Sequence, residues 1–308
     1  MTGLLASLQG AVAQGVLWGI LVLGVYITFR LMDVADMTVD GSFALGACIC
    51  AALVVNKGVD PMLALLVAVA AGMLAGTVTG ILHTIFEIPA ILAGILTQIS
   101  LWSINLRIMG GKSNIPLLKV DTVISKVGDA AGLTQAQASM IVGIVFVSLV
   151  IAFLYWFFGT EIGSAMRATG NNEDMVRALG VNTKMTKLLA LMVSNALVAL
   201  SGALVCQSQK YGDVGSGTGA IVIGLAAIVI GEVLLGRLTA FYWKLISVVL
   251  GSVIYFVIRA LVLRMGMNAN DMKLLSAIIV ALALCIPVAL AKYRLKKSYT
   301  EGGEEEEC

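Results

Sequence analysis

Long apolar segments recur along almost the whole chain, and they limit what it can fold into more than any other feature. We find nine such segments, at residues 11–29, 42–55, 62–82, 88–106, 138–158, 188–206, 220–235, 242–262 and 274–291. A helix that crosses a bilayer needs about 20 apolar residues. Hydrophobic residues make up 59% of the 308 and charged residues only 12%, which is more apolar surface than a soluble domain of this size can bury. We therefore predict an all-α polytopic membrane protein with about nine transmembrane helices.

The segments between these runs are too short to form a separate soluble domain. We predict a single transmembrane domain over residues 1–291, with a polar loop at 159–187, followed by a charged cytoplasmic tail at 292–308. With the C-terminus inside, eleven lysines and arginines fall on the inner side and eight on the outer side. Because positive charge favours the cytoplasmic side, this count supports a cytoplasmic C-terminus. Nine helices then place the N-terminus outside.

Two of the predicted helices, 42–55 and 220–235, are too short to cross a membrane alone. The first begins at the sequence DGS (40–42) and the second follows GDVGSGTG (212–219). They are the second and seventh helices, so they run in opposite directions, and paired short segments of this kind indicate the pathway of a transporter with an inverted repeat. The alternative is that both are ordinary helices whose ends are misjudged. Our translocation-pathway candidates from these breaks are Asp40, Gly41, Ser42, Gly215, Ser216 and Gly217.

Three aspartates lie between the first two apolar runs, where a charge near a bilayer is costly. We expect Asp33 and Asp36 at the inner boundary, hydrated or paired with Arg30. Asp40 precedes the short second helix, and we predict that it caps that helix by accepting hydrogen bonds from its free N–H groups.

Arg259 lies inside the eighth predicted helix, and ionisable residues in spans often mark a transport pathway. It can face an outer vestibule or a carboxylate such as Asp271 or Asp213, or its long side chain can reach the interface. We add Arg259 to the translocation-pathway candidates.

The third predicted helix carries Gly72, Gly76 and Gly80, which are spaced four apart on one face. This spacing lets two helix backbones approach closely inside a membrane.

The polar loop 159–187 contains the pattern of a short surface helix. Asn171 or Asn172 can serve as its N-cap, Glu173 and Asp174 fall in its first turn, and Gly180 follows its end. Side-chain acceptors and negative charge at the start, and glycine at the stop, are what helix termini favour.

This short helix also has an apolar side, formed by Met175, Leu179 and Val181, while Arg167 and Arg177 stay available for pairing. An amphipathic surface helix between two membrane helices is suited to docking into a groove of another protein. An ordinary solvated loop is the alternative reading of the same residues.

The sequence shows no constellation of catalytic or metal-binding residues. His83 is the only histidine, four of the five cysteines lie in apolar runs and the fifth is the terminal residue. GDVGSGTG lacks the Gly-Lys-Ser/Thr ending of a phosphate-binding loop, and the net charge of +2 comes without a basic patch for nucleic acid. We predict that the chain is not an enzyme, binds no metal or cofactor, and takes its energy from a partner or an ion gradient.

Several blocks of the sequence are similar to one family of membrane proteins. RATGNN (167–172) followed by ALGVN (178–182) and SNALVALSGAL (194–204) resembles the permease subunits of ATP-binding-cassette importers, in the superfamily of branched-chain amino acid and ribose-type permeases. GVYITFRLMDVADMTVDGSFALGA (24–47), GTVTGILHTIFEIPAILAGILT (76–97), GEVLLGR (231–237) and GMNANDMKLLSAIIVALAL (266–284) look like blocks of its tryptophan/tyrosine-type subgroup.

The resemblance implies a bacterial plasma-membrane permease that works as a homodimer. It implies a cytoplasmic ATP-binding-cassette ATPase that binds ATP and Mg²⁺, an extracytoplasmic substrate-binding (lipo)protein and a second permease copy as partners. In the family, the loop matching 159–187 carries the coupling helix that sits in a cleft of the ATPase. The ATPase-coupling residues implied here are Arg167, Asn171, Asn172, Glu173, Met175, Arg177, Leu179, Gly180 and Asn182.

Two other functions stay open. An ion-coupled secondary transporter is expected to place several carboxylates at the midplane, and the apolar runs are nearly free of acids. A membrane scaffold subunit that moves no solute is the third. The subgroup suggests an amino acid as solute, possibly aromatic, while related permeases carry sugars, nucleosides and branched-chain amino acids.

Overall fold

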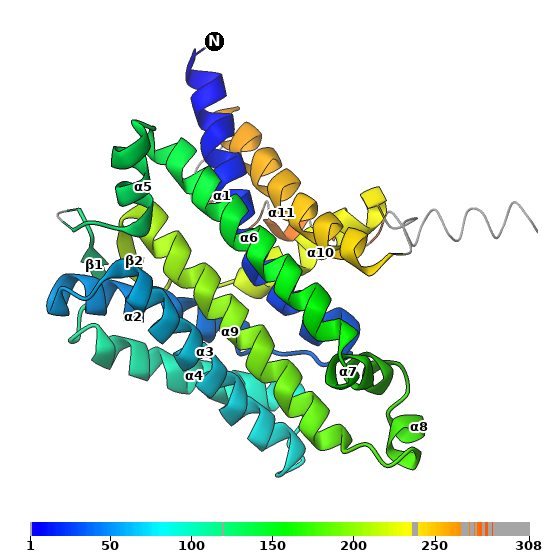
Figure 1. The fold of residues 1–308 in the computed structure, drawn as a ribbon. Coiled ribbons are helices and arrows are strands. Elements are labelled where there is room, and N and C mark those ends of the chain that lie inside the picture. The colour runs from blue at the N-terminus through cyan, green and yellow to red at the C-terminus, as the bar shows by residue number, and fades with distance from the viewer. Residues whose placement is uncertain are drawn as a thin grey trace, which may run out of the picture.

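The chain folds into a bundle of long helices (Figure 1). The computed structural model describes residues 2–118, 120–235 and 240–265, together with 271, 274, 276–278, 281–282 and 285. In chain order the elements are α1 (Thr2–Tyr26), the π-helical turn η1 (Ile27–Leu31), α2 (Val39–Lys57), α3 (Pro61–Thr84), α4 (Ala90–Ile108), β1 (Asn114–Pro116), α5 (Val123–Ala131), α6 (Gln135–Gly159), α7 (Glu161–Asn171), α8 (Glu173–Ala178), α9 (Thr183–Gln209), β2 (Tyr211–Asp213), α10 (Ala220–Leu235) and α11 (Phe241–Arg264).

Within the described residues, seven helical segments are long and apolar enough to cross a membrane, and α10 is a shorter apolar helix. Each of the first eight predicted runs coincides with one of these helices, so the all-α membrane architecture is confirmed. Most of the ninth run, 274–291, and all of the tail 292–308 fall outside the described residues. The total of nine spans therefore stays a prediction.

The prediction that the second helix is too short was wrong. α2 begins at Val39 and has 19 residues, which is enough to span. The helix begins before the predicted start at residue 42. The Asp40 carboxylate accepts hydrogen bonds from backbone N–H groups outside α2, so its charge is accommodated within the first turn of the helix. The 16 residues of α10 match the prediction for the seventh helix, and the inverted repeat stays a prediction.

α9 runs through the centre of the bundle, and α1, α2 and α3 pack against it. The predicted glycine stripe makes the α3–α9 contact possible. Gly72 lies against the carbonyl oxygen of Asn195 and Gly76 against that of Leu191, and neither position has room for a Cβ atom. The close helix approach predicted from the spacing of these glycines is confirmed.

The connecting segments divide between the two ends of the bundle. One end holds α5 and the antiparallel strands β1 and β2, which pair Ile115 with Gly212, and an ion pair of 2.9 Å joins Lys126 to Asp60. The opposite end holds α7 and α8, and the N-terminus lies at the α5 end (Figure 1). This division matches the one used in the charge count. The assignment of the α7–α8 end to the cytoplasm stays a prediction.

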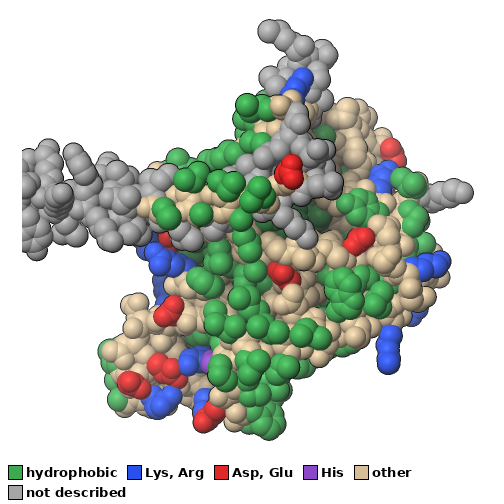
Figure 2. Space-filling view, turned by 180° about the vertical axis from the view of Figure 1, so that it is seen from behind, with side chains coloured by type: hydrophobic (Ala, Val, Ile, Leu, Met, Phe, Trp, Pro, Cys, Tyr) green, Lys and Arg blue, Asp and Glu red, His purple; other side chains and the backbone are tan. Residues whose placement is uncertain are grey.

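Large apolar side chains cover much of the outside of the bundle. On α6, for example, Ile144 is 48% exposed, Leu149 62% and Trp156 67%. Figure 2 shows hydrophobic side chains spread over the middle of the molecule, while many acidic and basic side chains gather near its lower end. An apolar exterior of this extent is unusual for a soluble protein and fits a protein surrounded by lipid.

Candidate functional site

The two sequence breaks that we singled out meet inside the bundle, through Asp40. Its carboxylate accepts hydrogen bonds from the backbone N–H of Gly219 at 2.8 Å and of Ile221 at 2.9 Å. Gly219 immediately precedes α10 and Ile221 lies in its first turn. N–H groups at a helix start have no partners within the helix, and the helix dipole favours a negative charge there. Asp40 therefore caps α10. The prediction that it caps its own helix was wrong, because α2 has already begun one residue earlier, at Val39.

The segment that precedes α10 is folded tightly against the start of α2. Gly217 touches the backbone carbonyl of Asp40 and leaves no space for a Cβ atom. Asp213 accepts a hydrogen bond from the N–H of Gly215 at 2.5 Å, which closes a turn before Gly217. The structure thus brings together Asp40, Gly215 and Gly217, while their role in the translocation pathway stays a prediction. Over the described parts of the chain, the hydroxyl of Ser216 is buried without a hydrogen-bond partner.

A buried chain of polar side chains continues from this point. Asp36 is 2% exposed, and its carboxylate accepts hydrogen bonds from Asn195 Nδ2 at 2.7 Å and from the Thr38 N–H at 2.9 Å. The Ser42 hydroxyl donates to Asn195 Oδ1 at 2.6 Å. We expected Asp36 to be hydrated or paired with Arg30, and this was wrong. The carboxylate is buried because an amide and a backbone N–H replace the water it would otherwise bind.

Arg30 pairs instead with Glu232 of α10, at 2.6 Å. This ion pair joins the end of η1 to the last turns of α10. Asp33 is exposed, in agreement with the prediction that it stays hydrated.

A row of threonine hydroxyls ties the start of α2 to α3 and α4. Thr38 Oγ1 lies 2.7 Å from Thr79 Oγ1, and the Thr79 hydroxyl lies 3.0 Å from Thr97 Oγ1. All three side chains are buried. Hydrogen bonds between side chains on different helices hold membrane helices together, at about 1 kcal/mol each.

Next to this row, a groove of about 370 Å³ opens between α2, α3 and α4. Thr97 and Ser100 supply its hydroxyl groups, and the remaining lining is apolar. Gly41 lies on the adjoining part of α2, where it contacts Leu101 and Gln98 of α4. The lining residues are Leu45, Ile49, Ala71, Leu74, Ala75, Val78, Leu82, Leu96, Thr97, Ser100, Leu101, Ile104 and Ile108.

Arg259 does not join these groups. Its guanidinium lies 5.7 Å from the centre of the Phe256 ring, and it has no ion pair with Asp213 or Asp271, both of which the structure describes. A cation over an aromatic ring is a modest stabilising contact. The structure thus gives Arg259 a ring partner instead of the carboxylate that we considered.

At the opposite end of the bundle, the predicted surface helix is present as α8. The side chain of Asn172 accepts a hydrogen bond from the Met175 N–H at 3.0 Å, so Asn172 is the N-cap, and Asn171 ends the preceding helix. Gly180 follows α8 with φ of +84°, a conformation that favours glycine. Asn182 then caps α9 by accepting from the Met185 N–H at 3.2 Å.

Residues 161–171, which we expected in the polar loop, form the helix α7. Thr160 caps it by accepting from the Gly163 N–H at 3.3 Å, and Met166 and Thr169 are buried on its inner side. The sequence hides this helix because glycine and threonine supply much of the buried side in place of large apolar residues. The coupling segment is therefore two short helices, α7 and α8.

Glu173 forms two ion pairs, and one of them anchors α8 to α9. It binds Lys187 of α9 at 2.6 Å and Arg177 of α8 at 2.8 Å. The hydrogen bond from Lys187, and then the nearby positive charges, hold the pKa of Glu173 below its ordinary value. Because a lowered pKa favours the charged form in the folded state, these ion pairs are present above the ordinary pKa of glutamate and are lost as the pH falls through the lowered one.

The outer side of α8 is apolar. Met175 is 51% exposed and Leu179 73%, whereas Val176 is buried and holds the helix against the protein. Val181, which we had assigned to the apolar side, is half-buried. A capped and anchored short helix with exposed large apolar side chains has the form of a docking element.

Arg167 is committed to the inside of the coupling segment. It donates a hydrogen bond to the Phe158 carbonyl at 2.8 Å, and its guanidinium lies 5.2 Å from the centre of the Phe241 ring. Both contacts lie within the protein, and pairing of Arg167 with another protein stays a prediction. Gly170 packs against the Leu31 carbonyl with no room for a Cβ atom. α7 thus contacts the ends of α6 and η1 and the start of α11.

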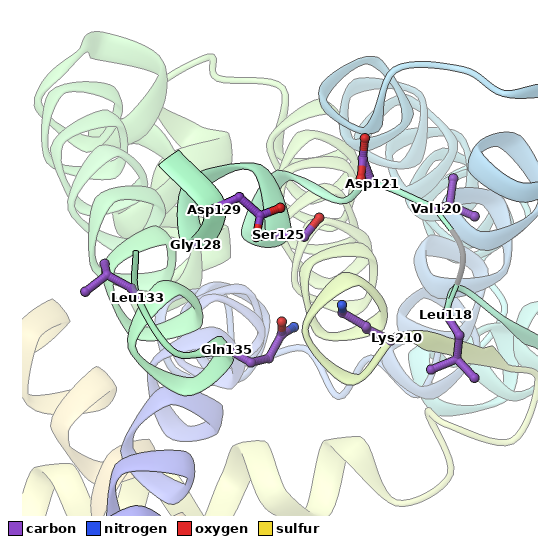
Figure 3. Close-up of a pocket in the computed structure, with 9 residues that line it drawn as sticks. All are labelled: Leu118, Val120, Asp121, Ser125, Gly128, Asp129, Leu133, Gln135 and Lys210. Carbon is purple, nitrogen blue, oxygen red and sulfur yellow. The ribbon is translucent and has the colours of Figure 1, made fainter. Parts of the chain in front are cut away.

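A polar pocket of about 350 Å³ lies at the α5 end. Figure 3 shows Gln135 and Lys210 pointing toward one another from opposite sides of it. The lining residues are Leu118, Val120, Asp121, Ser125, Gly128, Asp129, Leu133, Gln135 and Lys210.

Comparison with known proteins decides the family. The family described as branched-chain amino acid transport system / permease component matches residues 7–286 of the chain. The chain belongs to this permease family. The permease is 38% identical to the "Tyrosine transport system permease protein" of Clostridioides difficile (strain R20291) over 276 residues, which cover 90% of each chain. The resemblance to ATP-binding-cassette permeases seen in the sequence is thereby confirmed.

Two further matches have lower sequence identity. The permease is 28% identical to the "Autoinducer 2 import system permease protein LsrC" of Escherichia coli (strain K12 / DH10B), over 72% of this chain and 61% of that one. Among solved structures, "PsaBC from Streptococcus pneumoniae in complex with Fab" matches with a TM-score of 0.37 and 17% identity, over 81% of this chain and 89% of that one. So low a score does not establish a shared fold. The permease is a multi-pass transport subunit of a bacterial inner membrane.

Sequence reasoning missed Asn195, which joins Asp36 to Ser42. The available signal was an amide inside a long apolar run, since polar residues within spans usually contact other polar groups. It also missed Thr79 and Thr97. Threonine is common in membrane helices and often bonds to its own backbone, so no local signal distinguishes these two.

Proposed function

We propose that the permease is the membrane subunit of an ATP-driven importer for an amino acid with an aromatic side chain. The observation that carries this proposal is the 38% identity, over 90% of both chains, to a permease named for tyrosine transport. An identity of this size along the full length extends through the helices that surround Asp40 and through the coupling segment.

Coupling to an ATPase rests on α7 and α8. A cytoplasmic ATP-binding-cassette ATPase, which carries the ATP and Mg²⁺, seats α8 in a surface groove with Leu179 and Met175 as apolar anchors. Arg177 and Glu173 form the charged border of this contact, and Asn171, Asn172, Gly180 and Asn182 fix the ends of the helices that present it. Movement of α8 passes through α7, where Arg167 and Gly170 hold the ends of three other helices.

The solute crosses by alternating access, which is a shift between an inward-open and an outward-open packing of the same helices. Two permease copies form the path, and an extracytoplasmic binding protein delivers the solute at the α5 end. In each copy the part that rearranges is the junction of α2 and α10 at Asp40. The residues around it are Gly41, Ser42, Gly215, Ser216 and Gly217. Arg259 lies on α11 and contacts Phe256 of the same helix. We give it no role in this rearrangement.

Transport in proteoliposomes tests this function. The permease is co-expressed with the ATP-binding-cassette ATPase proposed as its partner, reconstituted, and supplied with the proposed substrate-binding protein and labelled tyrosine. We expect uptake that requires ATP and stops with a hydrolysis-deficient ATPase. Uptake driven by a proton or sodium gradient without ATP would indicate a secondary transporter, and a complex that moves no amino acid would indicate a scaffold.

Leu179→Asp is the matched variant for coupling. Because Leu179 is 73% exposed, the change leaves the fold intact, but it places a charge in the apolar contact. We expect normal membrane insertion and loss of ATPase binding in pull-down. Lys126→Asp, at the opposite end, is the control and should bind the ATPase normally. ATPase binding by the Leu179→Asp protein would contradict the coupling assignment.

A further inference from the structure

The turn between α3 and α4, residues 85–88, presents two large apolar side chains at the same end of the molecule as α8 (Figure 1). Ile85 is 63% exposed and Phe86 is 67% exposed. Both follow the last residue of α3, so they are not part of a spanning helix. Over the described parts of the chain, no other element covers them.

The turn has a fixed shape. The Phe86 N–H donates to the Ile81 carbonyl at 3.3 Å and the Ile88 N–H donates to the Leu82 carbonyl at 3.1 Å, which closes the C-terminus of α3. His83 Nδ1 lies 2.9 Å from the Ile88 carbonyl. These contacts hold Phe86 outward, so the exposed ring is a feature of an ordered turn.

An ion pair joins this turn to the coupling segment. Glu87 binds Lys184, in the first turn of α9, at 3.0 Å. The hydrogen bond and charge of Lys184, with a smaller effect of Arg177 on α8, lower the pKa of Glu87. Lys184 follows α8 closely in the chain, so its ion pair with Glu87 makes the turn and α8 neighbouring parts of one surface.

Two physical arguments favour a protein partner over lipid at this turn. Irregular backbone is not found facing the hydrocarbon of a bilayer, because its polar groups lack partners there. The charges of Glu87, Lys184 and Arg177 next to the apolar ring also reproduce the usual form of a protein interface, with an apolar centre and a polar rim.

We propose that residues 85–88 are a second docking site for the cytoplasmic ATPase, continuous with α8. Phe86 is its apolar anchor, Ile85 widens the contact, and the Glu87–Lys184 pair lies at its rim. This inference rests on the proposed function, because it takes the ATPase as the partner. It adds a contact on the α3–α4 connection, so that the ATPase acts on α3 and α4 directly as well as through α7 and α8.

Cysteine protection tests the second site. Phe86→Cys, Leu179→Cys and Lys126→Cys are made separately in a background with Cys285→Ser and Cys308→Ser, and each protein is placed in lipid nanodiscs with and without the bound ATPase. The rate of labelling by a water-soluble maleimide is measured. We expect position 86 and position 179 to label quickly alone and several-fold more slowly with the ATPase, and position 126 to label equally in both.

The outcomes separate the two proposals. Fast labelling at 86 in both states, with protection at 179, would overturn the second site and leave the coupling helix standing. Slow labelling at 86 without the ATPase would show that lipid covers the turn, which also overturns the second site. Protection at 86 alone would support it and refute the role of α8. No protection at either position, with no ATPase retained, would overturn both this inference and the proposed function.

Discussion

A carboxylate inside a membrane-spanning bundle needs hydrogen-bond donors in place of water, and the two aspartates at the start of α2 obtain them differently. Asp36 receives a side-chain amide and a nearby backbone N–H. Asp40 receives two backbone N–H groups from α10, far along the chain. Donors that would otherwise lack partners at a helix start are the ones that gain most from a negative acceptor, so Asp40 stabilises a helix to which it does not belong.

Replacing Asp40 with asparagine removes the charge and one of the two acceptor oxygens. We expect the free energy of unfolding in detergent to fall by about 1 kcal/mol, as for the loss of an N-cap, and the cost to appear in α10. Asp33→Asn is the matched control, because Asp33 is exposed and asparagine tolerates its φ of +53° as well as aspartate does. Equal stability of the two variants would show that the Asp40 contacts contribute nothing.

At the scale of elements, the packing of α3 on α9 depends on residues that lack side chains. Backbones that approach closely gain van der Waals contact, which is the main force between helices in lipid. The stripe of Gly72, Gly76 and Gly80 permits this approach. The buried hydroxyls of Thr79 and Thr97 then link α3 to α4, so small and polar residues, and not large apolar ones, determine how these helices associate.

Gly76→Ala tests this packing. A Cβ atom at position 76 would overlap the Leu191 carbonyl, so α3 and α9 must separate, and we expect a loss of about 1–3 kcal/mol in the free energy of unfolding. Gly10→Ala, in a helix position with no atom within 4 Å of the added carbon, is the control. Alanine there should be neutral or slightly stabilising, because it favours helix. Denaturant titration in detergent measures both, and an unchanged Gly76→Ala protein would contradict the close packing.

The success of sequence reasoning depended on how local each feature is. The caps of α8 lie within a few residues of the helix, so Asn172 and Gly180 could be predicted from their neighbours. The role of Asp40 could not, because its partners Gly219 and Ile221 come close only in the folded chain. α7 was missed because its 11 residues include few large apolar side chains, so the segment resembles a polar loop. The family was recognisable because its blocks of sequence run along the whole chain.

At the scale of the whole molecule, the connecting segments are sorted to two ends, and the charge count assigns the α7–α8 end to the cytoplasm. We expect Lys126→Cys to react with a membrane-impermeant maleimide added to intact cells, and Ala178→Cys to react only after the cells are permeabilised. Both positions are exposed, so access to the solvent on each side decides the result. The reverse pattern would place the N-terminus inside.

α9 begins where the coupling segment ends and continues past Asn195 to the opposite end of the bundle. Its 27 residues make a rod of about 40 Å at about 1.5 Å per residue, and a helix of this kind resists compression along its axis. Asn195 is therefore rigidly connected, through the helix, to the first turns of α9, which contain Lys184 and Lys187. We expect a tilt imposed there to shift the Asn195 amide relative to Asp36 and Ser42, and so to change which of these hydrogen bonds are made.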